Sequence, residues 1–159
     1  MTDERFIETA RQIYATPESL RDFNADIVAQ FRANGGAIVS GPLAGAPLLL
    51  LTVAGPDGPE LVPLAWVDDG ERLVVAASKG GSDEHPFWYF RLLDDAFATV
   101  EVGTESYRVR ATEATGVERD RLYEVVAAAL PMFRHYAART TRIIPVFVLE
   151  RLGLRDDVP

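Results

Sequence analysis

Three apolar segments follow one another between residues 47 and 77, separated only by short turns. The first turn reads Gly55-Pro56-Asp57-Gly58 and the second reads Asp68-Asp69-Gly70, and such residues favour tight reversals of the chain. Segments joined this closely pair antiparallel, because a parallel connection needs a dozen or more residues. The pattern predicts a β-meander with strands at residues 47–53, 61–67 and 72–77.

Further strands are predicted on both sides of this meander. Residues 106–114 alternate Tyr107 and Val109 with Arg108 and Arg110, which is typical of a strand with one exposed face. The other predicted strands are residues 37–39, 99–102 and 143–149. Six or seven antiparallel strands with peripheral helices predict a mainly β, α+β fold built on a small barrel.

Three helical segments surround the predicted barrel. Thr16 and Pro17 suit the start of a helix whose apolar positions recur at helical spacing as far as Asn34. A short aromatic helix is predicted from Pro86 to about residue 93, and a longer one from 118 to 138 with an interruption near Pro131. We therefore expect one domain over residues 1–159, with N-terminal helices at 1–34 and the barrel at 37–150.

Composition excludes several classes of function. The chain has no cysteine, so it forms no disulfide, thiol nucleophile or cysteine-bound metal site. Its formal net charge of −8 disfavours a nucleic acid partner. No apolar stretch is long enough to span a membrane, and the polar N-terminus is unlike a signal peptide. We expect a cytoplasmic monomer or homodimer whose partner is a small-molecule substrate.

The single lysine of the chain, Lys79, stands where the predicted strand 72–77 ends. It lies between Ser78 and the pair Gly80-Gly81, and the aromatic helix beginning at Pro86 follows. Two glycines let backbone N–H groups converge on an anion, a lysine adds a mobile charge, and a helix N-terminus is partially positive. The segment predicts a pocket for a phosphorylated, ring-bearing ligand. An ordinary turn after a strand is the alternative interpretation.

The remaining polar residues give no sign of a metal site or of paired catalytic acids. His85 and His135 are far apart in the sequence, and neither is expected to bind metal. Asp68-Asp69 and Asp94-Asp95 are interpreted as solvated turn residues rather than a general acid and base.

Two blocks of the sequence carry a resemblance to a known family. The first is Ala77-Ser78-Lys79-Gly80-Gly81 followed by His85-Pro86-x-Trp88-Tyr89, and the second comprises Tyr136, Thr140, Arg142 and Ile144-Pro145-Val146. In this order and spacing they resemble the deazaflavin-dependent nitroreductase family of actinobacteria, over roughly residues 22 to 150. The resemblance implies a split β-barrel and reduced coenzyme F-420, a deazaflavin, as hydride donor. It also implies an electron-poor substrate such as a quinone, nitro compound or enone.

The resemblance implies roles for individual residues. Ser78, Lys79, Gly80 and Gly81 would line the cofactor, beside Pro86 and the pocket wall formed by Trp88. Tyr136 would donate a hydrogen bond to the reducible group of the substrate, with Ser78 as the second catalytic residue. Because hydride chemistry belongs to the cofactor, the protein needs only to bind, orient and exclude water.

The chain departs from the family pattern in the loop at residues 55–60. Basic residues that hold the cofactor phosphate in the family are replaced here by Asp57 and Glu60. Arg91, Arg32 or Arg142 would have to supply the missing charge, and Arg91 is the candidate cofactor-binding residue. Two alternatives remain open: an FMN enzyme on the same barrel, or a relative that has lost the redox cofactor and acts as a small-molecule-binding or non-redox biosynthetic protein. Two tyrosines common in the family stand here as Leu130 and Phe133.

Overall fold

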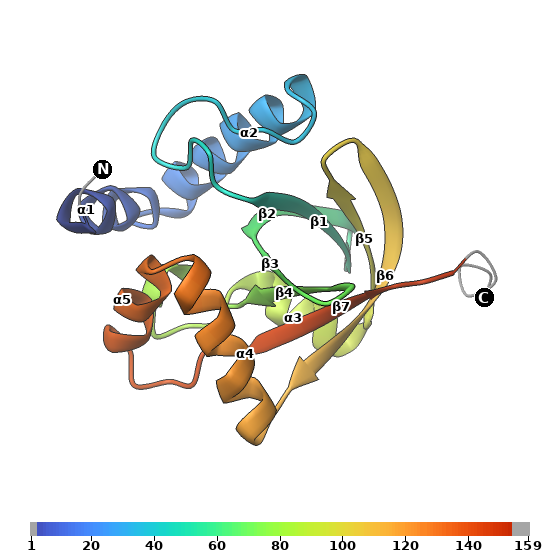
Figure 1. The fold of residues 1–159 in the computed structure, drawn as a ribbon. Coiled ribbons are helices and arrows are strands. Elements are labelled where there is room, and N and C mark those ends of the chain that lie inside the picture. The colour runs from blue at the N-terminus through green and yellow to red at the C-terminus, as the bar shows by residue number, and fades with distance from the viewer. Residues whose placement is uncertain (1–2, 154–159) are drawn as a thin grey trace.

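The computed structural model describes residues 3–153, and their centre is one antiparallel sheet of seven strands. The strand order is β2-β1-β5-β6-β7-β4-β3, and the sheet curls into a half-barrel (Figure 1). This confirms the predicted fold class. The strands are β1 (Leu48–Gly55), β2 (Gly58–Ala65), β3 (Val67–Asp69), β4 (Arg72–Ala76), β5 (Phe97–Val102), β6 (Glu105–Ala114) and β7 (Val146–Arg151).

Five α-helices surround the sheet. Helix α2 lies along the outside of β1 and β2, and α1 lies beside α2 and α5, away from the sheet (Figure 1). Helices α4 and α5 cover the opposite side of the barrel, over β4 and β7. The α-helices are α1 (Asp3–Ile13), α2 (Pro17–Ala33), α3 (Phe87–Asp94), α4 (Gly116–Ala129) and α5 (Met132–Ala138), with a short 3-10 turn, η1 (Lys79–Gly81).

Local sequence signals set most helix boundaries. The Thr16 side chain accepts a hydrogen bond from the Ser19 N–H at 3.0 Å, and Pro17 is the first residue of α2, as predicted. Pro131 separates α4 from α5, which confirms the predicted interruption. Helix α3 begins one residue later than predicted, at Phe87. Pro86 is its N-cap residue and has an extended conformation.

The apolar run 61–67 does not form one strand, which corrects the meander prediction. Its first part belongs to β2 and pairs only with β1, and its last residue opens β3, which pairs with β4. The chain changes direction at Trp66, whose N–H donates to the Pro47 carbonyl oxygen at 3.1 Å. Although β2 and β3 follow each other in the chain, they form the two opposite edges of the sheet. The sheet is therefore open between these two strands.

The predicted strand at residues 37–39 is wrong. These residues lie in a loop whose Val39 and Ser40 N–H groups donate to the side-chain oxygen of Gln30, at 3.0 and 3.1 Å. Because a side chain satisfies this backbone, no neighbouring strand is needed. Ile38 is nevertheless buried, against α2 and β1. The last strand also begins later than predicted, at Val146.

Three apolar clusters hold these elements together. The first cluster fills the barrel interior with side chains from β1, β4, β5, β6 and β7. Helix α3 packs Trp88 and Leu92 against this cluster. A second cluster joins α4 and α5 to the outer face of β4 and β7. The third joins α2 to β1 through Ile27 and Phe31. Burial of such side chains is the main force that positions the helices around the barrel.

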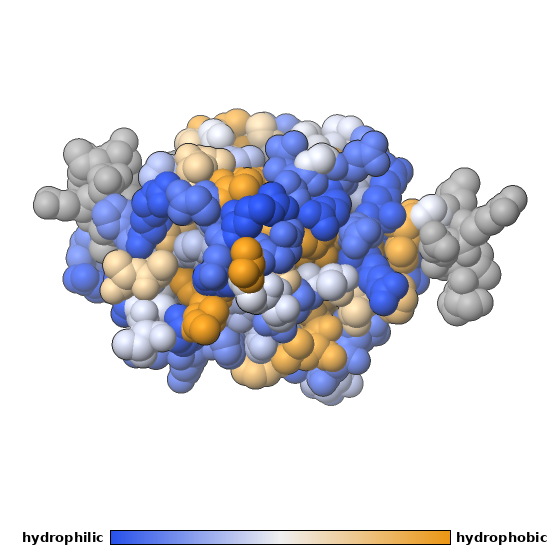
Figure 2. All heavy atoms as spheres, turned by 60° about the horizontal axis from the view of Figure 1, so that its bottom comes forward, coloured by the Kyte–Doolittle hydropathy of each residue, from blue (hydrophilic) through white to orange (hydrophobic). Residues whose placement is uncertain are grey.

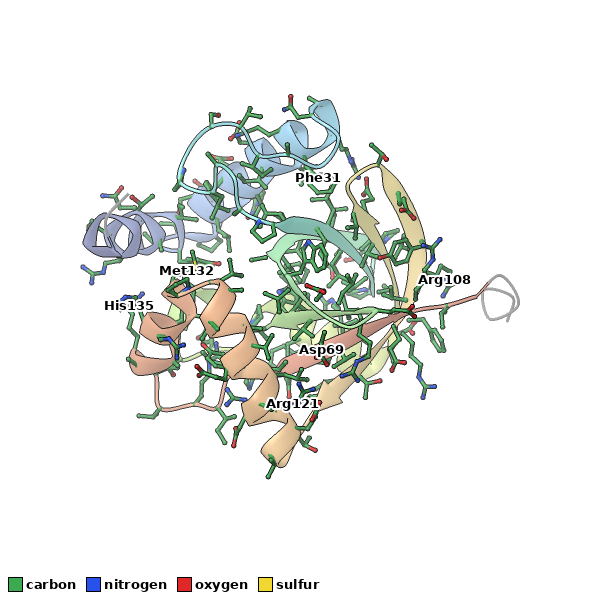
Figure 3. The ribbon with its side chains drawn as sticks, viewed as in Figure 1. Phe31, Asp69, Arg108, Arg121, Met132 and His135 are labelled. Carbon is green, nitrogen blue, oxygen red and sulfur yellow. The ribbon has the colours of Figure 1, made fainter. Side chains whose placement is uncertain are left out.

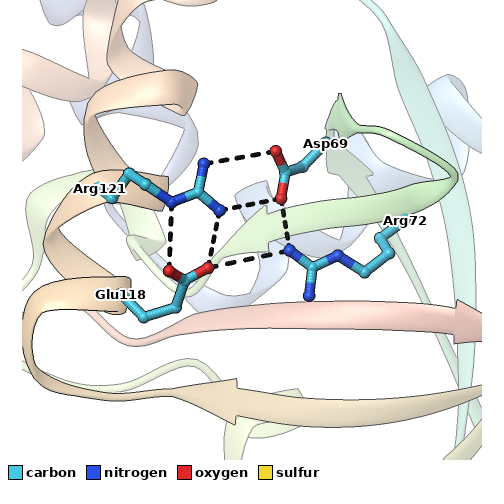
Figure 4. A network of polar contacts seen from close by, with 4 residues as sticks. All are labelled: Asp69, Arg72, Glu118 and Arg121. Atoms are coloured by element: carbon cyan, nitrogen blue, oxygen red, sulfur yellow. Dashed lines mark hydrogen bonds and ion pairs between the residues drawn. The ribbon is translucent and has the colours of Figure 1, made fainter.

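A network of four charged side chains links the β3–β4 hairpin to α4 (Figure 4). Arg121 donates to Asp69 at 3.0 Å and to Glu118 at 2.7 Å, and Arg72 contacts both carboxylates. These side chains are half-exposed, so each pair contributes at most about 1 kcal/mol to stability.

The molecular surface is largely hydrophilic. On the face shown in Figure 2, hydrophobic side chains form separate small patches among hydrophilic ones. Isolated patches of this kind are ordinary for a folded domain. Within residues 3–153, no helix has the length and apolar character needed to cross a bilayer.

Candidate active site

A cavity of about 270 Å³ lies between the N-terminal helices, β2, the Ser78-Lys79 segment, the start of α3 and the α4–α5 turn. Its walls are mainly apolar, and Met132 at the start of α5 faces the side where the N-terminal helices lie (Figure 3). Its polar lining includes Thr9 and Asn24 from the N-terminal helices as well as Ser78 and Lys79, which follow β4. The aromatic residues of the lining are Tyr14, Phe23, Phe87, Trp88, Phe133 and Tyr136.

Five of the site residues expected from the sequence line this cavity: Ser78, Lys79, Pro86, Trp88 and Tyr136. They come from three separate segments of the chain that the fold brings together. Ser78 and Trp88 are buried, at 8% and 3% exposure, and Tyr136 is also buried, at 7%.

Gly80, Gly81 and Arg91, which were also expected at the site, are not part of the cavity lining. Gly80 and Gly81 lie behind the wall that Tyr14 and Tyr136 form. Arg91 lies one turn further along α3 than Phe87, a residue that does line the cavity.

The segment after β4 has an unusual backbone. Lys79, Gly80 and Gly81 all have positive φ angles, of 46°, 63° and 82°. The Gly81 N–H donates to the Ser78 carbonyl oxygen at 3.0 Å, and the Ser82 N–H donates to the Lys79 carbonyl oxygen at 3.1 Å. Both N–H groups serve the turn itself, so the Gly81 N–H is not part of the anion-binding nest that was expected from the two glycines.

Both glycines are explained by close packing. A Cβ atom at Gly80 would lie 2.8 Å from the ring of Tyr14, and one at Gly81 would lie 2.8 Å from the carbonyl oxygen of Tyr136. Two cavity-lining aromatic residues, one from the N-terminal region and one from α5, thus rest on this turn. The glycines shape the cavity by letting its walls approach.

Arg142 holds the same turn from the other side. Its guanidinium donates to the carbonyl oxygens of Ser78 at 2.7 Å, Ala77 at 3.2 Å and Ser82 at 2.7 Å. Burial lowers the pKa of Arg142, yet an arginine stays charged in a protein. Arg139 adds a hydrogen bond to the Gly80 carbonyl oxygen at 2.9 Å. The carbonyl groups of the turn are therefore fixed by two arginines.

His85 completes this arrangement. Its Nδ1 lies 3.1 Å from a guanidinium nitrogen of Arg142, and its ring stacks on Tyr89 with centroids 4.3 Å apart. Because Arg142 can only donate, Nδ1 accepts and the neutral ring carries its proton on Nε2. Burial, and then the charge of Arg142, lower the pKa of His85, although Glu113 acts in the opposite direction.

We expect stability to fall as the pH drops through the range in which His85 titrates. The folded protein holds His85 neutral, with its pKa below the ordinary value of 6.5, so the unfolded chain binds its proton first. Its contribution is complete above about pH 6.5 and is lost as the pH falls below that value. Urea unfolding at several pH values would measure this. The His85→Asn variant, whose amide oxygen can still accept from Arg142, should show a smaller loss; an equal loss would assign the dependence to other groups.

Tyr136 is the candidate proton or hydrogen-bond donor in the cavity. Burial raises the pKa of its phenol well above the ordinary range, and the nearby Tyr14 adds to the effect. The phenol therefore keeps its proton at neutral pH and remains a hydrogen-bond donor. Tyr123 lies behind it in the α4–α5 cluster and donates to the Phe133 carbonyl oxygen at 2.5 Å.

The three arginines considered as substitutes for the missing basic loop are all engaged. Arg91 pairs with Glu60, Arg32 pairs with Glu101 at 2.9 Å, and Arg142 binds the turn described above. Lys79 has a weaker partner: its ammonium lies 3.4 Å from Glu84, which is 83% exposed. Of these four cations, Lys79 is the one that lines the cavity, and it is the most available to a ligand.

The N-terminal helices are the part of the site that the sequence did not predict. Tyr14 follows α1 and Phe23 belongs to α2, and both line the cavity. Helical apolar spacing predicts that a residue such as Phe23 is buried, but it does not show that the helix borders a cavity. Among residues 3–153, no group of three or more His, Asp or Glu side chains is arranged to hold a metal ion.

Comparison with known proteins identifies the family. The sequence model of the F420H(2)-dependent quinone reductases matches residues 25–151. This chain belongs to that family. A member from Mycobacterium tuberculosis, named an F420H(2)-dependent quinone reductase, is 33% identical over 115 residues, which cover 69% of this chain and 77% of that protein.

Solved structures of related proteins share the split barrel. An F420-H2-dependent reductase (FDR-A) is 33% identical, with a TM-score of 0.61, covering 65% of this chain and 94% of that one. A structure described as a domain-swapped dimer is 29% identical, with a TM-score of 0.63, and covers 82% and 98% of the two chains. The resemblance expected from the Ser78–Trp88 and Tyr136–Val146 blocks is therefore confirmed.

Proposed function

We propose that this protein is an oxidoreductase that transfers hydride from reduced coenzyme F-420 to a small electron-poor substrate of the quinone class. The observation that carries the proposal is the cavity itself. In a member of the F420H(2)-dependent quinone reductase family, it brings Ser78, Lys79, Trp88 and Tyr136 together in a mainly apolar, aromatic lining.

The residues present fit a deazaflavin. A flat tricyclic ring needs aromatic and aliphatic walls, which Trp88, Phe87 and Leu64 provide. The polar edge of the ring needs a few placed groups, and Ser78 and Lys79 supply a hydroxyl and a cation. The coenzyme, when bound, supplies the hydride, and the chain provides binding, orientation and exclusion of water.

Tyr136 is proposed as the group that assists the substrate. Its neutral phenol can donate a hydrogen bond to the carbonyl oxygen of a quinone, on which negative charge develops as hydride arrives. Gly81, against which the Tyr136 backbone packs, keeps the residue in place. Ser78, which also lines the cavity, is proposed as a second donor.

One observation favours the alternative of a relative that binds a different ligand. The acidic loop leaves no unpaired basic side chain at residues 55–60, and Arg91 is held by Glu60. A ligand with a smaller charge, such as FMN or an unphosphorylated ring, would meet less repulsion here than a polyanionic tail.

Equilibrium binding distinguishes these possibilities. Purified protein would be titrated with oxidised coenzyme F-420, and separately with FMN, while the fluorescence of each ligand is followed. The proposal predicts saturable binding of F-420 that is tighter than that of FMN. Preference for FMN, or no binding of either, would favour the alternatives.

Lys79→Ala should weaken binding of coenzyme F-420 about tenfold or more, because a charge-assisted contact is worth about 1.5–3 kcal/mol. Since Lys79 has a φ of 46°, Lys79→Asn serves as the matched variant: asparagine tolerates this backbone but carries no charge. Both variants should lose affinity to a similar degree. Unchanged affinity in the two variants would make Lys79 a turn residue only.

A further inference from the structure

An ion pair between Arg91 of α3 and Glu60 of β2 lies close to residues that line the cavity, although neither side chain is part of the lining. Arg91 donates from Nε to one carboxylate oxygen of Glu60, and its Nη2 lies 3.4 Å from the other. The two side chains are 27% and 35% exposed. An ion pair this open to solvent is weak and can exchange partners.

The position of the pair follows from its neighbours in the two elements. Val62, on the same face of β2 two residues after Glu60, lines the cavity. Phe87, one helical turn before Arg91 on the same face of α3, also lines it. The ion pair therefore continues the cavity wall beyond its aromatic part, in the direction of the β1–β2 hairpin.

The carboxylate of Glu60 is seated in a space made by a glycine. A Cβ atom at Gly55 would lie 2.6 Å from the carboxyl carbon of Glu60 and 2.6 Å from one of its oxygens. Gly55 is in β1, directly opposite Gly58 of β2. A larger residue at position 55 would require the Glu60 carboxylate to move, whereas glycine leaves room for it beside Arg91.

Other acidic groups lie near Arg91 and make its surroundings anionic. The hydrogen bond from Arg91 lowers the pKa of Glu60, so Glu60 is ionised at neutral pH. Asp94 and Asp57 lie close enough to raise the pKa of Arg91 further. With Glu60 in place, a second anion approaching Arg91 would meet three carboxylates and one cation.

We propose that Glu60 is an internal counter-anion that holds Arg91 in the free protein, and that a phosphate or carboxylate group of the bound ligand displaces it. This inference rests on the proposed function, because it assumes an anionic tail attached to the ring in the cavity. A phosphate accepts two parallel hydrogen bonds from a guanidinium and carries more charge than a carboxylate. Glu60, already in contact with solvent, can turn outward when it leaves.

Glu60 would then set specificity through competition. Every anionic ligand must remove the carboxylate before it gains the arginine, whereas a ligand without an anionic tail is unaffected. This exchange would also make the acidic hairpin compatible with a phosphorylated coenzyme. The cation that the phosphate needs is Arg91, which Glu60 occupies in the free protein.

Binding of coenzyme F-420 to Glu60→Gln, Arg91→Gln and the double variant tests the proposal. Removing the competitor should tighten binding about three- to tenfold, and removing the cation should weaken it at least fivefold. In the double variant, the loss of Glu60 should have no further effect, because the two residues act on one contact. The deazaflavin ring compound without its phosphate tail should bind all four proteins with similar affinity.

Glu101→Gln is the matched control, because Glu101 also pairs with an arginine, Arg32, and lies outside the cavity. It changes the net charge by the same amount and should leave affinity unchanged. Equal tightening in Glu60→Gln and Glu101→Gln would show a general charge effect and overturn the proposal. Unchanged or weaker binding in Glu60→Gln would also overturn it. If neither the wild type nor Glu60→Gln binds the coenzyme, the proposed function fails as well, so the two failures are distinct.

Discussion

Arg142→Ala is expected to lower the free energy of unfolding by about 3 kcal/mol and to abolish ligand binding in the cavity. The guanidinium satisfies three carbonyl oxygens of residues 77, 78 and 82, as well as Nδ1 of His85. Hydrogen bonds to a charged group are worth about 1.5–3 kcal/mol each. Because Arg142 is only half-buried, water can replace some of these hydrogen bonds in the variant, which reduces the loss of stability. Without it, the turn that carries Ser78 and Lys79 loses its fixed shape.

Urea unfolding measures the first effect and ligand titration the second. Arg134→Ala is the control, since Arg134 belongs to the adjacent helix and pairs with Glu124 on the exposed surface at 2.7 Å. That substitution should cost at most about 1 kcal/mol and leave binding intact. Similar losses of stability in the two variants would contradict the structural role assigned to Arg142.

Gly81→Ala should destabilise the protein by about 3 kcal/mol. Gly81 has a φ of 82°, which costs an L-residue about 1 kcal/mol or more. The added methyl group would also lie 2.8 Å from the Tyr136 carbonyl oxygen and 3.0 Å from its Cα. Forcing these backbones apart costs about 1–3 kcal/mol more and displaces Tyr136 from the cavity wall.

Gly70→Ala separates the two causes. Gly70 has a similar φ of 69°, but no atom lies within 4 Å of the position its Cβ would take. This variant should lose only the conformational part, about 1 kcal/mol. Equal losses of unfolding free energy at positions 70 and 81 would mean that the packing of α5 on the turn contributes nothing.

The fold was largely predictable because its signals are local. Apolar segments with turn residues between them define the strands, and Pro131 divides the last helical region. The errors arose where distant parts of the chain decide the structure. The run 61–67 is uniform in sequence, but pairing with β1 on one side and β4 on the other divides it at Trp66. Of residues 37–39, Ile38 is buried because it packs on α2 and β1, while Val39 is exposed, and the segment lies in a loop.

The candidate site was predictable only in part. Ser78, Lys79 and Trp88 belong to one short segment, so the sequence places them together. The contacts of Arg142 with that segment join residues far apart in the chain, and no local pattern reveals them. Gly80 and Gly81 were expected to line the cofactor, and the sequence does not show that they instead accommodate Tyr14 and Tyr136. Nor does it show that Arg91 and Glu60 neutralise each other.

The proposed reaction can be measured directly. Reduced coenzyme F-420 would be mixed with a quinone, with and without the protein, and the return of the oxidised coenzyme's absorbance would be followed together with hydroquinone formation. We predict that the protein accelerates the reaction and that one hydroquinone forms for each coenzyme oxidised. Lys79→Ala should reduce the rate at subsaturating coenzyme. A rate equal to that without protein, at coenzyme concentrations that saturate binding, would contradict the assignment of this protein as a deazaflavin-dependent quinone reductase.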